Sequence, residues 1–101
     1  MNRVSIATLV VSLLAASAAF AAYDVPKDEP QFLQCKAYSL TKYQGGDEAS
    51  PIPGQNKADA FCSCMWHETP ENFKGSLAKF SETDAGAKTN AMCEKHSGWQ
   101  S

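Results

Sequence analysis

The chain has 101 residues, with nine basic and eleven acidic side chains, two histidines and four cysteines. Its only arginine is Arg3, and the other charges are scattered and slightly negative in sum. This argues against nucleic-acid binding, because arginine is the preferred residue for phosphate and base recognition. A chain of this length forms one small domain, and such domains often need covalent help to stay folded.

The N-terminal segment has the pattern of a secretory signal peptide. Arg3 supplies a positive start, and an apolar, Ala-rich run ends on the A-x-A motif Ala19-Phe20-Ala21. The acidic, turn-like residues 23–26 that follow do not resemble the flank of a membrane anchor. We therefore expect residues 1–21 to be removed. Residues 22–101 would then be a single exported domain, in the bacterial periplasm or outside the cell, with no membrane span.

The expected mature chain is rich in aromatic residues and poor in valine and isoleucine, which leaves little material for a sheet. The sequence predicts an all-α domain of three to four short, disulfide-stapled helices. A first helix should run from near Pro30 to Tyr43, with Asp28 or Glu29 near its cap. Its apolar residues recur at helical spacing, with Phe32 beside them: Leu33, Ala37 and Leu40.

A polar loop rich in glycine and proline should follow, over residues 44–56. A loop of this length is either a binding loop or a connection that the fold tolerates without a role in binding, and both interpretations stay open. Asn56 should cap a second helix that ends before Pro70. One arc of this helix should hold its large apolar side chains together with a cysteine: Phe61, Cys62, Met65 and Trp66. Ser63 and His67 should point away from that arc.

Two more helices complete the prediction. A third should begin at Thr69-Pro70 and carry Phe73, Leu77 and Phe80 at helical spacing, although Gly75 weakens its middle. A last helix should open at Thr83 or Asp84 and stop at Ser97-Gly98. Its apolar residues would be Ala87, Ala91, Met92 and Cys93.

Four cysteines in a small exported chain predict two disulfides. Cys62 and Cys64 lie two residues apart on one helix, so their side chains diverge and cannot reach each other. One should bond to Cys35 and the other to Cys93, which would join the second helix to the helices before and after it. Spacing does not choose between Cys35–Cys62 with Cys64–Cys93 and Cys35–Cys64 with Cys62–Cys93.

A metal site is the chemical alternative. Cys64 and His67 form one C-x-x-H pair, and Cys93 and His96 form another. Two facing helices could offer these four side chains to zinc, or the thiolates together with Met65 to copper. The oxidising compartment and the simple disulfide pattern argue against this reading, and a lone histidine on the exposed face is usually only solvated.

No arrangement of serine, histidine and carboxylate indicates catalysis, so we expect a non-enzyme without a cofactor. The favoured function is a rigid scaffold that binds a protein partner, for example an inhibitor or immunity protein acting on an envelope or extracellular enzyme. The expected contact residues are Trp99 near the C-terminus and Asp47, Glu48 and Ile52 in the polar loop. Trp99 could instead fold back over the last helix as a lid. A metal-binding protein and a structural component of an envelope assembly are the two alternatives.

Overall fold

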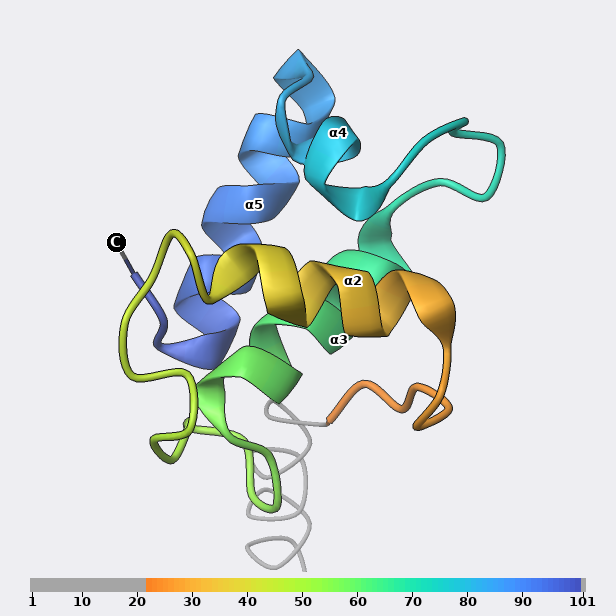
Figure 1. Cartoon of the computed structure of the whole chain (residues 1–101). Coiled ribbons are helices and arrows are strands. Elements are labelled where there is room, and N and C mark those ends of the chain that lie inside the picture. Colours follow the sequence, from red (N-terminus) through yellow and green to blue (C-terminus); the bar gives the residue numbers. More distant parts are fainter. Residues whose placement is uncertain (1–21, 101) are drawn as a thin grey trace, which may run out of the picture.

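The computed structural model describes residues 22–100, so the expected signal peptide lies outside the described residues. Within this range the chain forms four helices, and its only β-pairing is one isolated bridge. The helices are α2 (Pro30–Ser39), α3 (Lys57–Glu68), α4 (Leu77–Ser81) and α5 (Asp84–Ser97) (Figure 1). The predicted all-α fold is confirmed. None of these four helices is long and apolar enough to cross a membrane.

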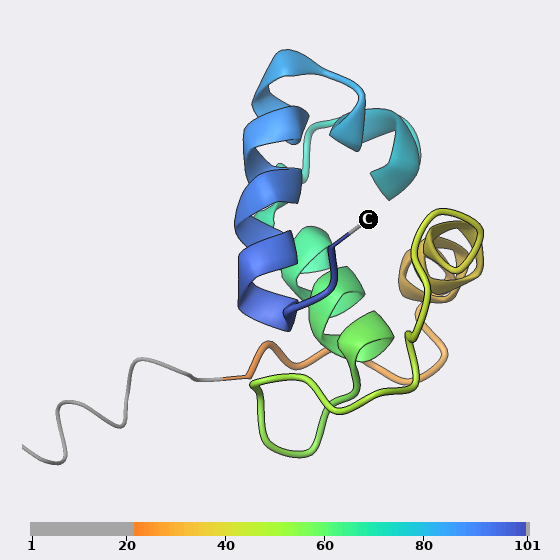
Figure 2. The same ribbon diagram turned by 90° about the vertical axis from the view of Figure 1, so that its left-hand side faces the viewer.

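Helix α3 is the central element. It packs against α5 on one side and α2 on the other, while α4 packs on α5 and α2. Figure 2 views α2 almost along its axis and shows α3 between it and α5. Most of α3 is therefore buried, and this includes Ser63, which was wrongly predicted to point away from the core. Tyr23 and Val25 pack on the core and line the same hollow as Ser63.

The helix ends follow local capping signals. Glu29, Asn56 and Thr83 each accept hydrogen bonds from the first turn of α2, α3 and α5, as predicted. Gly98 ends α5 in the left-handed conformation, with φ of 69°. Helix α2 is shorter than predicted, because it ends at Ser39 and residues 40–42 form a turn.

The predicted third helix does not begin at Pro70. Its first residues form a turn in which the Phe73 N–H donates to the Pro70 carbonyl, and Gly75 adopts φ of 135°. An L side chain rarely adopts this conformation, so the helix can begin only after it, at the Ser76 cap of α4. The Phe73 ring still reaches Phe80 of α4, at 5.2 Å between centroids.

The buried faces of helices α2 and α5 differ from the faces that the spacing of their apolar residues predicted. Helix α2 buries Phe32, Cys35 and Ser39. Helix α5 buries Gly86, Cys93 and Ser97, while the three other apolar residues of its predicted set are exposed, namely Ala87, Ala91 and Met92. The disulfides explain the difference, because each cysteine must face α3 and so fixes the rotation of its helix.

The loop over residues 44–56 is packed rather than slack. An antiparallel bridge joins Ala49 to Asn56, and the N–H of Ala58 donates to the carbonyl of Gly46. Gly46 is buried, and a Cβ atom there would lie within 3 Å of Leu40 and of Trp99. The loop is therefore held between the end of α2 and the C-terminal residues.

Candidate functional site

The four cysteines form two disulfides that join α3 to both of its neighbours. Cys35 of α2 is bonded to Cys62, and Cys64 is bonded to Cys93 of α5. The structure thus has the first of the two pairings that spacing left open. All four cysteines are buried and none is free. The disulfides are a framework that fixes the three helices, and they position the surfaces described below.

The alternative metal site does not assemble. Cys64 and Cys93 are bonded to each other, whereas zinc or copper would need them as thiolates. Across residues 22–100, no three or more side chains of His, Cys, Asp or Glu are grouped to hold a metal ion. The two cysteines of the C-x-x-H pairs are thus disulfide partners rather than thiolates.

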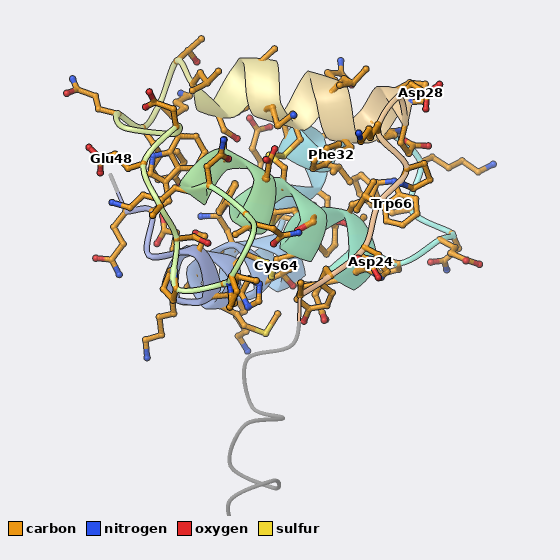
Figure 3. All side chains as sticks on the ribbon, turned by 90° about the horizontal axis from the view of Figure 1, so that it is seen from below. Asp24, Asp28, Phe32, Glu48, Cys64 and Trp66 are labelled. Carbon is orange, nitrogen blue, oxygen red and sulfur yellow. A yellow bond between two sulfur atoms is a disulfide. The ribbon has the colours of Figure 1, made fainter. Side chains whose placement is uncertain are left out.

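The two histidines instead flank the N-terminal segment. The Tyr23 ring lies 5.1 Å from the ring of His67 and 5.0 Å from that of His96. Nε2 of His67 donates a 2.6 Å hydrogen bond to the backbone oxygen of Asp24. His67 is exposed as predicted, yet it is not merely solvated. Figure 3 shows Asp24 near Trp66, at the end of the molecule opposite Glu48.

Two titratable groups in this cluster have shifted pKa values. The Tyr23 hydroxyl donates to Glu68 at 2.9 Å, and this hydrogen bond, with smaller effects of burial and charge, raises the pKa of Tyr23. Nε2 of His96 is buried without a hydrogen-bond partner, and burial lowers the pKa of His96. The cluster fastens the segment that precedes α2, which is a structural role.

The four predicted contact residues separate into two kinds. Asp47 and Glu48 are exposed, and Glu48 pairs with Lys57 at 2.9 Å. Trp99 and Ile52 are each only 1% exposed, so in this structure they offer no surface to a partner. The Trp99 ring lies inside the core, where it packs on Tyr43 and Phe61.

Helix α2 carries an exposed apolar face that spacing alone would place in the core. Leu33 and Leu40 are 45% and 55% exposed, and Ala37 between them is also exposed. We call these three residues the outer face of α2, with Leu40 as the C-cap that directly follows the last helical residue. The signal that could have found it is Cys35, which must point at α3 and so turns Leu33, Ala37 and Leu40 outward.

The outer face is continuous with a hollow beside the polar loop. The hollow has a volume of about 210 Å³ and is lined by Leu40, Lys36, Asp47 and Asp59, among others. Lys36 and Asp59 form an ion pair of 3.1 Å at its edge. The structure thus brings Asp47, one of the predicted contact residues, next to the apolar face of α2.

A second concave feature lies between α2 and α4. This cleft has a volume of about 270 Å³, is partly open to solvent and also touches α3 and α5. Its apolar lining includes Cys35, Phe61, Met65 and Leu77, and its polar lining includes Ser39 and Lys42. Sequence reasoning missed it, because no local pattern indicates which polar side chains two packed helices leave facing a common space.

Comparisons with protein-family models, with curated proteins and with solved structures found no match. The function must therefore be argued from the surfaces themselves.

Proposed function

We propose that the chain is an exported binding module that contacts a protein partner through the outer face of α2 and the neighbouring Asp47. The observation that carries this proposal is the exposure of Leu33 and Leu40 on a helix whose other side is buried. A helix that is apolar on two sides is normally covered on both. Here the core covers one side, and nothing in residues 22–100 covers the other.

The disulfide on the buried side supports this role. Cys35 lies on the face of α2 opposite its exposed leucines and is bonded to α3. The outer face is therefore held in one orientation before a partner arrives, which reduces the entropy lost on binding. Apolar residues on a monomer surface, with polar residues at the edge, are typical of protein-binding sites.

The expected partner presents an apolar patch with a positive group at its edge, because the exposed Asp47 lies beside Leu40, whereas Asp59 is already paired with Lys36. An envelope or extracellular enzyme that the chain inhibits is the partner class we propose. Disulfides are typical of proteins in oxidising compartments, which supports binding to the partner outside the cytoplasm. A structural envelope assembly is the second candidate, and the same experiment separates the two by the identity of the captured protein.

The test uses two exposed alanines as a matched pair. A photo-crosslinking residue replaces Ala37 on the outer face of α2 in one variant and Ala87 on α5 in the other. Crosslinking in the producing cells should give a discrete adduct from position 37 and none from position 87. Mass spectrometry then identifies the protein in the adduct.

A second pair of variants checks that the contact is apolar. Leu33→Gln with Leu40→Gln should abolish the adduct at position 37, while Met92→Gln, which changes a similarly exposed residue of α5, should not. Thermal melting of each variant shows that it is folded. An adduct that persists in the double leucine variant would contradict the proposal.

A further inference from the structure

The cleft between α2 and α4 has a mixed polar and apolar lining, and its apolar part can take a compact apolar group. Phe61 and Met65 of α3 line it together with Leu77 of α4. Its volume is about 270 Å³, and an apolar cavity of about 150 Å³ is enough to bind benzene. The space therefore suits a single ring or a short branched chain carrying one small polar substituent.

Ser39 places a buried hydroxyl in this cleft without a strong partner. Ser39 is 3% exposed, and its hydroxyl contacts the sulfur atoms of Cys35 and Cys62, at 3.9 and 3.8 Å. Disulfide sulfur is a weak acceptor, and buried hydroxyls normally find an oxygen or nitrogen partner. A ligand that brings an acceptor oxygen would supply what Ser39 lacks.

Lys42 adds a positive charge from the turn that follows Ser39. Its Nζ lies 5.5 Å from the centre of the Tyr38 ring, and both side chains line the cleft. The ion pairs within residues 22–100 use Lys36 and Lys57, so Lys42 has no acidic partner there. Ser39 and Lys42, three residues apart in the sequence, thus contribute a hydroxyl and a lysine side chain to the lining of the cleft.

Among residues 22–100, no acidic side chain lines the cleft. The nearest one that its lining residues contact is Glu94, whose Oε2 accepts hydrogen bonds from the Tyr43 hydroxyl at 2.7 Å and from the Asn90 amide at 3.3 Å. These donors occupy that oxygen of Glu94. Lys42 is thus the charged residue of the lining itself, and the Glu94 carboxylate is held by two of the lining residues, Tyr43 and Asn90.

From these contacts we propose that the cleft binds a small monocarboxylate with an apolar body the size of a phenyl ring. The carboxylate accepts hydrogen bonds from Ser39 and Lys42, and the apolar body packs on Phe61, Met65 and Leu77. This site is separate from the outer face of α2, so either proposal can fail without the other.

The test compares three probes on the purified, oxidised protein at pH 7. The probes are 3-phenylpropionate, its neutral amide 3-phenylpropanamide, and acetate, and binding is followed by amide NMR shifts. The acid should saturate with shifts centred on residues 38–43 and 77–81. The amide should bind about threefold to fivefold more weakly, the size of an exposed charge pair. Acetate, which has no apolar body, should not saturate.

Matched variants assign the contacts. Lys42→Met should lower the affinity for the acid to that for the amide. Lys88→Met, on the exposed surface of α5, should leave the acid binding more tightly than the amide. Ser39→Ala should lower the affinity for the acid by about twofold to tenfold, which corresponds to the loss of one hydrogen bond. Ala78→Leu should fill the cleft and abolish binding, and Ala87→Leu, at an exposed position, should not.

Three results would overturn the proposal. The first is equal affinity for the acid and the amide in the unmodified protein. The second is saturable binding that survives Ala78→Leu in a protein that melts normally. The third is tenfold tighter binding of a tetrapeptide that ends in phenylalanine with a free carboxylate than of 3-phenylpropionate. That result would assign the site to a protein C-terminus and not to a small acid.

Discussion

The indole Nε1 of Trp99 donates a 2.7 Å hydrogen bond to the backbone oxygen of Gln44, 55 residues earlier in the chain. The same ring packs on Tyr43 at 4.9 Å and on Phe61 at 5.8 Å between centroids. The contact therefore joins the C-terminal residues to the start of the polar loop and to α3. It makes Trp99 part of the fold, whereas its place just beyond Gly98 left open both a contact residue and a lid.

Trp99→Ala should consequently destabilise the domain by about 3–5 kcal/mol, the cost of removing a large buried aromatic side chain. Chemical denaturation measures this change. Trp66→Ala is the control, because Trp66 is only partly buried and its loss should cost less. A Trp99→Ala protein as stable as the unmodified chain would show that the indole is not packed in the core in solution.

Gly86→Ala should be among the most damaging single-methyl substitutions in the chain. A Cβ atom at Gly86 would lie 1.6 Å from the backbone oxygen of Phe80, so the first turn of α5 could no longer pack on the end of α4. We expect a loss of about 3 kcal/mol or more, at or beyond the usual cost of overpacking. Ala87→Ser changes the next, exposed residue and should leave the melting temperature nearly unchanged. Equal melting of the two variants would contradict this packing.

Removing either disulfide should cost about 3–4 kcal/mol in the loop-entropy model, because the bonded residues are 27 and 29 positions apart. Small domains have only about 5–15 kcal/mol of stability. We therefore expect both the Cys35→Ala/Cys62→Ala and the Cys64→Ala/Cys93→Ala proteins to be severely destabilised.

Thiol titration gives an independent check on the pairing. The unmodified protein, denatured without a reductant, should show no free thiol, and each double variant should show none either. Two thiols in the Cys35→Ala/Cys62→Ala protein would mean that Cys64 and Cys93 are not bonded to each other.

The parts of this fold that the sequence predicts are those with local causes. Asn56 and the Thr69-Pro70 step fix both ends of α3, and Thr83 and Gly98 fix those of α5. The inability of Cys62 and Cys64 to bond to each other also follows from helix geometry alone. The choice between the two remaining pairings does not, since it depends on which side of α3 each neighbour occupies.

The buried faces of α2 and α5 could not be predicted from apolar spacing. On α2 the leucines mark one side, but the bond from Cys35 to Cys62 turns another side inward, and Ser39 follows it into the core. On α5 the side that packs is marked by a glycine, because close contact with Phe80 needs the absence of a side chain. Both candidate sites follow from these rotations, which apolar spacing does not reveal.

The pH dependence of stability near neutrality should depend on His96. Its Nε2 is buried beside the Tyr23 ring without a hydrogen-bond partner, and burial lowers its pKa from the usual 6.5. The folded state therefore binds a proton at His96 less readily than the unfolded state does. Where the unfolded state binds more protons, stability rises with pH.

The domain should accordingly lose stability as the pH falls below about 6.5, until the pH reaches the lowered pKa of His96 in the folded state. Urea denaturation between pH 5.5 and 7.5 measures this, in a range above the usual pKa values of Asp and Glu. His96→Gln should reduce the slope, because glutamine does not titrate. Val25→Ala, which trims another residue of the same segment, should lower stability by a similar amount at every pH. If the slope is the same in His96→Gln as in the unmodified protein, His96 does not lie in the buried position beside Tyr23.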